Sequence, residues 1–211
     1  MKSAARSDVV ILVADVCMEA TVRGLLSRWK SLGIRQVQFD LYRHPEKDPG
    51  CRTHGADFLA PLRAKYEHAL LMFDHEGCGD CATSAIGHEA VLGTALARSW
   101  GDRAAALVIE PELDIWVWSR SPHVESVLGW SGRRPALRDW LVQKEFLVNA
   151  TAKPSRPKEA LEAALRHVKK PRSSAIYQAL AEKVSLQECV DPSFARFRAI
   201  LKKWFGVNDE R

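Results

Sequence analysis

Three short, uninterrupted apolar runs restrict what this chain can fold into more than any other feature. The runs are Val9–Val13, Leu70–Phe73 and Ala104–Ile109. Runs of this length without polar interruptions are typical of strands that are buried on both faces. Segments with apolar residues at helical spacing separate them, and strands that alternate with helices favour a parallel sheet. The sequence therefore predicts an α/β fold with a parallel sheet of about four strands flanked by helices.

The remaining elements of this core follow from periodicity and from turn residues. Alternating apolar residues predict a further strand at Arg35–Leu41, and helical spacing predicts helices at residues 18–32, 56–66 and 84–99. Residues 42–55 contain two prolines, two histidines and Gly50, so we expect a loop there.

The character of the chain changes after Gly132. Residues 1–132 carry 14 Lys and Arg against 17 Asp and Glu, whereas residues 133–204 carry 16 against 7. After this point we expect a helix within residues 133–150 that ends near Asn149, and helices at residues 159–169, 173–183 and 192–205. We therefore expect an α/β domain at residues 1–132 and a small, basic helical C-terminal unit at residues 133–211 that packs on it. A basic surface attracts phosphates, but it also simply keeps a helical unit soluble.

Acidic residues follow three of the predicted strands. They are Asp15 after the first, Asp74 and Glu76 after the third, and Glu110 and Glu112 after the fourth. Functional side chains of parallel sheets gather at the carboxyl ends of the strands, and closely spaced carboxylates repel each other unless a cation or a proton lies between them. Mg²⁺ prefers such oxygen ligands. The alternative is that these acids are solvated loop residues that cap the following helices.

Two further groups of residues allow more than one interpretation. His75, Cys78, Cys81 and His88 have a spacing that can hold Zn²⁺, although one compact run is atypical of structural zinc sites. Cys78 and Cys81 also form a Cys-x-x-Cys pair, but without the flanks of a redox motif. We favour ordinary turn residues with free thiols. The tryptophans within residues 116–140 can stack on bases or pack in the core, and we favour packing.

Composition excludes some classes of protein. No apolar run approaches the roughly 20 residues that cross a bilayer, and the polar N-terminus does not resemble a signal peptide. Five irregularly spaced cysteines fit a reducing compartment better than a disulfide framework. We therefore expect a cytoplasmic protein without a membrane partner.

Taken together, these patterns resemble the TOPRIM fold, and more closely an uncharacterised bacterial family of TOPRIM-like proteins found in anti-phage defence loci. Three pieces carry the resemblance: the strand–helix unit at residues 9–26, the Asp74-His75-Glu76 step, and the acidic, tryptophan-containing step from Ile109 to Trp116. The tail at residues 173–204 is also similar to the end of that family. The resemblance thus covers most of the chain, although each motif is short.

The resemblance implies a metal-dependent nuclease. Asp74 and Glu76 match the paired acids that hold Mg²⁺ or Mn²⁺ in the family, and Asp15, Glu19 and Glu112 are the candidate catalytic residues that complete the site. The glutamate that TOPRIM enzymes place after the first strand is replaced here by Ala14, so Asp15 or Glu19 would have to substitute for it.

The expected substrate is a nucleic acid, DNA rather than RNA. Arg23, Arg28, Arg133 and Arg134 are candidates for contacts with its phosphates. Membership of a defence system implies protein partners from the same system. The alternative function is a catalytically inactive TOPRIM-like subunit that binds or assembles such a system but has lost the acid at position 14.

Overall fold

The structure, a computed structural model, describes residues 6–187 and 189–207. Its centre is a four-stranded, all-parallel sheet with the strand order β2-β1-β3-β4. The strands are β1 (Ser7–Val13), β2 (Phe39–Arg43), β3 (Tyr66–Asp74) and β4 (Ala104–Ile109). The predicted fold class, an α/β protein with a parallel sheet flanked by helices, is confirmed.

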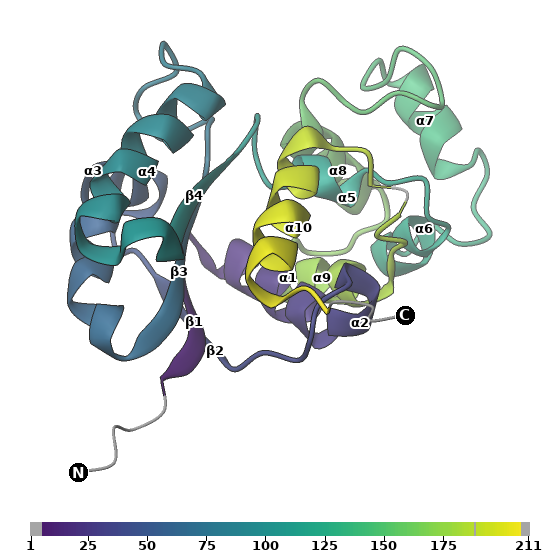
Figure 1. The fold of residues 1–211 in the computed structure, drawn as a ribbon. Helices are drawn as coiled ribbons and strands as arrows, with labels where there is room; N and C mark the ends of the chain where they lie inside the picture. The colour runs from purple at the N-terminus through teal and green to yellow at the C-terminus, as the bar shows by residue number, and fades with distance from the viewer. Residues whose placement is uncertain (1–5, 188, 208–211) are drawn as a thin grey trace.

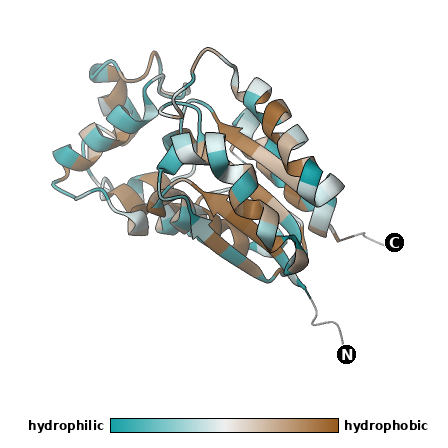
Figure 2. Cartoon of the chain, turned by 90° about the vertical axis from the view of Figure 1, so that its left-hand side faces the viewer, coloured by the Kyte–Doolittle hydropathy of each residue, from teal (hydrophilic) through white to brown (hydrophobic). Residues whose placement is uncertain are grey.

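Helices cover both faces of the sheet (Figure 1). On one face lie α3 (Lys47–Leu59) and α4 (Ala85–Trp100), and on the other lie α1 (Val16–Ser27), α9 (Ser174–Lys183) and α10 (Pro192–Phe205). Successive side chains of β1 point to opposite faces, so Val9 and Ile11 join one hydrophobic cluster and Val10 and Leu12 the other. Figure 2 shows that the strands consist mainly of hydrophobic residues, whereas the helices around them contain both hydrophobic and hydrophilic residues.

Short helices complete the chain. They are α2 (Trp29–Leu32), the 3₁₀ helices η1 (Ala60–Ala64) and η2 (Gly101–Arg103), α5 (Asp114–Val117), α6 (His123–Leu128), α7 (Leu137–Gln143) and α8 (Pro157–His167). None of the helices in the described part of the chain is both long and apolar enough to cross a membrane.

The C-terminal helices pack directly on the sheet layer. Helix α9 lies along α1, where Gly24 permits a close approach: a Cβ atom at this position would lie 2.8 Å from the Cβ of Ala181. The predicted packing role of the tryptophans is confirmed, because Trp116, Trp118, Trp130 and Trp140 are all buried. The Trp116 indole N–H, for example, donates to the Ser193 hydroxyl at 2.7 Å and so joins α5 to α10.

The prediction of a loop at residues 42–55 is wrong, because α3 begins at Lys47. Pro49 lies in the first turn of α3, where a missing N–H removes no helical hydrogen bond. Gly50 and Gly55 are there because space is short: a Cβ at Gly50 would collide with the His44 ring, and one at Gly55 with Leu71. Residues that normally break helices are therefore used here for close packing.

Other predicted boundaries are partly wrong. The second strand begins at Phe39 instead of Arg35. The single helix expected at residues 18–32 is divided into α1 and α2, and the left-handed Gly33 ends the second of them. The helix expected within residues 133–150 is present as Leu137–Gln143, but it ends before the expected Asn149. Strand β4 and helix α10 have the predicted bounds.

Strand β4 lies at one edge of the sheet, and side chains engage its outward-facing backbone. The Val108 N–H donates to Glu89 Oε1 at 2.9 Å, and Arg196 Nη2 donates to the Val108 carbonyl at 3.1 Å. Arg196 Nε also donates to Glu89 Oε1 at 3.1 Å. Helices α4 and α10, from opposite faces, are thus joined across the edge of the sheet.

Candidate functional site

Two acidic residues from different elements, Asp48 and Asp74, lie close together at the carboxyl edge of the sheet. Asp74 is the last residue of β3, and its backbone N–H donates to Asp48 Oδ1 on α3 at 2.8 Å. Asp74 Oδ1 accepts a hydrogen bond from the Leu113 N–H at 2.9 Å, which ties β3 to the segment after β4. Within the described residues, neither Asp48 nor Asp74 has a lysine or arginine at ion-pair distance, and Asp74 Oδ2 accepts no hydrogen bond.

Further acids surround this pair closely enough to change its protonation. Burial raises the pKa of Asp74 well above its usual value, and the charges of Asp48, Asp114, Asp15 and Glu112 raise it further. Burial and then the charge of Asp15 raise the pKa of Asp48, although the hydrogen bond from Asp74 opposes this. Both acids therefore bind a proton more readily at this edge than they would in water, unless a cation balances their charge.

Two acids after β4 do have cationic partners. Glu112 is buried, accepts a hydrogen bond from the Lys158 N–H at 3.1 Å and lies 3.9 Å from Lys158 Nζ. Burial and the charge of Asp114 nevertheless raise the pKa of Glu112 to about 7. A carboxyl group with this pKa exchanges protons near neutral pH, which is the property of a general acid or base.

Asp114 is the most completely partnered of these acids. Its Oδ1 accepts a hydrogen bond from the Tyr177 hydroxyl at 2.6 Å, and its Oδ2 lies 3.3 Å from Arg172 Nη2. Arg172 Nε in turn donates to the Tyr177 hydroxyl oxygen at 2.7 Å. Burial raises the pKa of Asp114, while Tyr177 and Arg172 lower it. The C-terminal helical part of the chain thus supplies partners for the acids at the sheet edge.

The predicted catalytic residues Asp15 and Glu19 lie beside the site and already have partners. Asp15 caps α1 by accepting a hydrogen bond from the Met18 N–H at 2.8 Å, although its charge still reaches Asp74. Glu19 forms ion pairs with Arg23 at 3.0 Å and Arg43 at 3.1 Å. Ala14, at the position where the resemblance would place the TOPRIM glutamate, is buried, and its methyl group packs in the core.

The predicted metal ligands differ from each other in their surroundings. Asp74 lies in the carboxylate pair, whereas Glu76 is exposed, and its backbone N–H donates to the Pro111 carbonyl at 2.8 Å. The charge of Glu76 raises the pKa of Glu112, so it remains on the rim of the site. Glu110, the other acid after β4, is exposed.

Sequence reasoning missed Asp48 and Asp114. Asp48 lies in the segment where the sequence predicts a loop. It does not directly follow a predicted strand, so nothing in the sequence indicated that it belongs to the site. Asp114 belongs to the Ile109–Trp116 step and continues the alternating acids Glu110 and Glu112, so that spacing was a usable signal.

The four predicted phosphate-binding arginines have different surroundings. Arg28 Nη1 donates to the carbonyls of Ala181 and Val184, so this side chain holds the end of α9 against α1. Arg23 is paired with Glu19. Arg133 and Arg134 are exposed, and Arg133 Nε donates to the Gly129 carbonyl at 3.2 Å.

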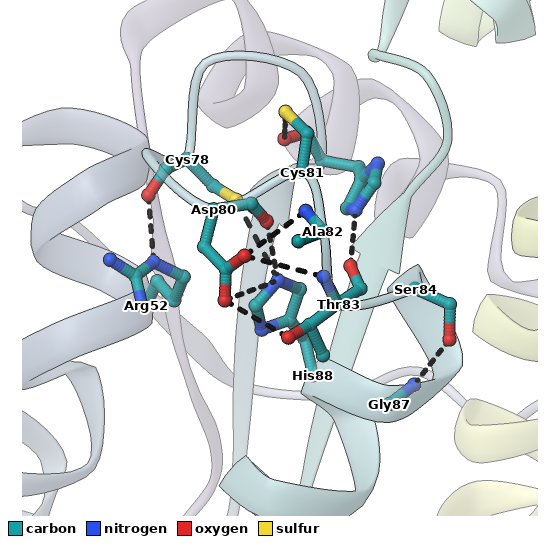
Figure 3. A network of polar contacts seen from close by, with 10 residues as sticks. Arg52, Cys78, Asp80, Cys81, Ala82, Thr83, Ser84, Gly87 and His88 are labelled. Carbon is teal, nitrogen blue, oxygen red and sulfur yellow. Dashed lines mark hydrogen bonds and ion pairs between the residues drawn. The ribbon is translucent and has the colours of Figure 1, made fainter.

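The segment with the cysteine and histidine pairs is a hydrogen-bonded turn (Figure 3). Asp80 accepts hydrogen bonds from the backbone of Ala82 and Thr83, and His88 Nε2 contacts the Asp80 carbonyl oxygen at 2.8 Å. Cys78 Sγ lies 3.9 Å from His88 Nε2, whereas His75 Nε2 contacts the Thr83 carbonyl oxygen and Cys81 Sγ the His75 carbonyl oxygen.

Across residues 6–187 and 189–207, no group of three or more His, Cys, Asp or Glu side chains is arranged to hold a metal ion. This finding argues against a closed, all-protein cage such as structural zinc requires. Mg²⁺ differs, because it keeps several waters and is commonly held by one or two carboxylates together with substrate phosphates. The Asp48–Asp74 pair fits that second kind of site.

Comparison of this chain with models of protein families, with curated proteins and with solved structures finds no match.

Proposed function

We propose that this chain is a Mg²⁺-dependent (or Mn²⁺-dependent) TOPRIM-like phosphodiesterase that cleaves nucleic acid as a component of an anti-phage defence system. The observation that carries the proposal is the Asp48–Asp74 pair at the carboxyl edge of the sheet, where Asp74 ends β3 and Asp48 lies in the first turn of α3. Its two carboxylates have no cationic partner in the described chain, and three further acids lie close enough to raise the pKa of Asp74. A divalent cation would relieve this repulsion.

Asp74 and Asp48 are the residues that would hold the ion, with Asp15 nearby. When bound, Mg²⁺ neutralises phosphate charge and orients an attacking water or a leaving oxygen. Glu112, with its pKa of about 7, is the group suited to hold or release a proton at neutral pH. Lys158 and Arg172 restrict how much negative charge accumulates, because they pair with Glu112 and Asp114.

The surrounding assignments belong to the same proposal. We place the protein in the bacterial cytoplasm, with DNA rather than RNA as its substrate and with protein partners from the same defence system. Arg133 and Arg134 are exposed and remain candidates for phosphate contacts. Arg28 is a weaker candidate, since its guanidinium already serves two backbone carbonyls of the C-terminal part.

The test is an isosteric double substitution. In Asp48→Asn/Asp74→Asn each side-chain oxygen can still accept its backbone hydrogen bond, so the fold should persist while the charge is lost. We expect cleavage of labelled DNA with Mg²⁺ or Mn²⁺ to fall to background, and calorimetry to show loss of metal binding. Asp57→Asn, an exposed acid on the same helix α3, is the matched control and should behave like the wild type. Full cleavage by the folded double variant would reject the proposal.

A separate substitution decides the role of Glu76. If this exposed carboxylate completes the metal site, Glu76→Gln should weaken Mg²⁺ binding measurably while thermal stability stays unchanged. Unaltered binding would restrict the ligands to Asp48 and Asp74.

A second candidate function is a non-catalytic TOPRIM-like subunit, and the buried methyl group of Ala14 favours it. This alternative predicts no hydrolysis with either ion but retained association with DNA or with a partner protein. The same cleavage assay on the wild type therefore separates the two functions.

A further inference from the structure

A polar cavity of about 750 Å³ opens beside the carboxylate pair, at the carboxyl ends of β1 and β2. Three basic side chains line it: Arg43 at the end of β2, Lys47 at the start of α3 and Arg172 before α9. The cavity shares two residues with the candidate site. Asp15 lines it and influences Asp48 and Asp74, and Arg172 lines it and contacts Asp114.

The basic groups of the cavity keep unused hydrogen-bonding capacity. Arg43 contacts Glu19 through Nε, and no other contact to a described residue engages its guanidinium. Arg172 uses Nε for Tyr177 and Nη2 for Asp114, and its Nη1 has no partner among the described residues. Lys47 is exposed and forms no ion pair within the described chain.

The two acids of the cavity are already engaged. Asp15 caps α1, and Glu19 is shared between Arg23 and Arg43. The backbone starts of α1, at Val16 and Cys17, and of α3, at Lys47, also line the cavity, and helix starts carry partial positive charge. The cavity therefore favours anions, whereas the adjacent carboxylate pair favours a cation.

We infer that this cavity binds a phosphate group of the nucleic-acid strand, next to the phosphodiester that lies at the carboxylate pair. Arg43 and Lys47 would contact that phosphate directly. Arg172 would present its free Nη1 to it from a side chain that Tyr177 and Asp114 hold in place. This inference deepens the proposed function and rests on it for the identity of the strand, but phosphate binding in the cavity requires no metal.

The test measures binding without metal, so that cleavage cannot intervene. A fluorescent single-stranded oligothymidylate is titrated with wild-type protein in EDTA at several salt concentrations, and unlabelled oligonucleotide or inorganic phosphate is added as competitor. The variant is Arg43→Gln/Lys47→Gln, because both side chains are exposed and should be dispensable for folding. Arg63→Gln, an exposed cation on η1 outside the cavity lining, is the matched control.

We expect the double variant to bind the oligonucleotide roughly tenfold more weakly, the order of two exposed charge-assisted contacts. The salt dependence of its log affinity should fall by about 1 for each cation removed. The Arg63→Gln protein should match the wild type in both measures, and unlabelled oligonucleotide should compete far better than inorganic phosphate.

Equal affinities and salt slopes for the double variant and the Arg63→Gln control would overturn the inference. Competition by inorganic phosphate as effective as by the oligonucleotide would also overturn it, since the cavity would then serve a free anion. Either result leaves the proposed cleavage intact if Asp48→Asn/Asp74→Asn still abolishes it. Conversely, the double variant could bind more weakly as expected while the wild type cleaves no DNA. That result would support the phosphate site and reject the proposed cleavage.

Discussion

Asp114 and Asp74 are both desolvated carboxylates beside the carboxyl edge of the sheet, but their surroundings differ. Asp114 has a tyrosine hydroxyl and an arginine, both from the C-terminal part of the chain. Within the described chain, the Asp74 carboxylate accepts a single hydrogen bond, from the Leu113 N–H, and the charge that raises its pKa most is that of another acid, Asp48. A buried charge with a full set of partners holds elements together, whereas one without them leaves capacity for an ion or a proton.

The largest expected effect comes from removing the partnered acid. Asp114→Ala leaves the Tyr177 hydroxyl and Arg172 without their acceptor, and we expect a loss of about 3 kcal/mol in the free energy of unfolding. Urea denaturation measures it. Asp139→Ala, at an exposed acid on α7, should change stability by less than about 0.5 kcal/mol. A loss at Asp114 no greater than in this control would contradict a structural role.

The acids whose pKa is raised in the folded state should make stability depend on pH in the opposite sense to carboxylates whose partners lower their pKa. Because the pKa of Glu112 is raised from 4.5 to about 7 in the folded state, the folded protein binds more protons than the unfolded chain between these values. For Glu112, and likewise for Asp48 and Asp74, unfolding free energy therefore falls as pH rises and levels off above the folded pKa.

Denaturation in EDTA between pH 4.5 and 7 tests whether the free energy of unfolding falls as pH rises. If the proposed metal site is correct, Mg²⁺ should raise the melting temperature more at pH 8 than at pH 5, because ionised carboxylates bind it better. The Asp48→Asn/Asp74→Asn protein should show a flatter pH dependence and little response to Mg²⁺. Stability that rises with pH through this window in the wild type, and not in the variant, would show that these acids are compensated after all.

The smallest expected effect concerns the link between Lys158 and Glu112. In the wild type, the Lys158 ammonium group lowers the pKa of Glu112. Lys158→Met removes this group but keeps the backbone N–H that donates to Glu112. The pKa should therefore move above about 7, and since the Lys158 side chain is half exposed, stability should change by only about 0.5 kcal/mol. An NMR titration of the Glu112 carboxyl measures the shift, and Lys144→Met serves as the control.

The sequence predicted the sheet well, because buried parallel strands are read directly from apolar runs such as Ala104–Ile109. The carboxyl edge followed from that topology, and with it the positions of Asp74 and Glu112. Helix α3 could not be predicted in the same way, because its two glycines are explained only by the close approach of His44 and Leu71. Asp48 was lost with it.

The hydrogen-bond and ion-pair partners of the acids could not be predicted from the sequence for a different reason. An acid at the end of a strand can cap the next helix, as Asp15 does, or accept a backbone N–H from a more distant segment, as Asp74 does, and both look alike in a sequence. Arg172 and Lys158 lie far along the chain from Asp114 and Glu112, so only the packing of the C-terminal helices shows which acids they neutralise.

The clamp that Glu89 and Arg196 form around Val108 also affects how the protein behaves among copies of itself. An open edge strand offers its backbone to strands of other chains, which is a common route to aggregation. Here the donor and the acceptor of Val108 are already occupied by charged side chains from both faces. The β4 edge is thereby closed to sheet extension at that point, which keeps this margin of the fold from recruiting foreign strands.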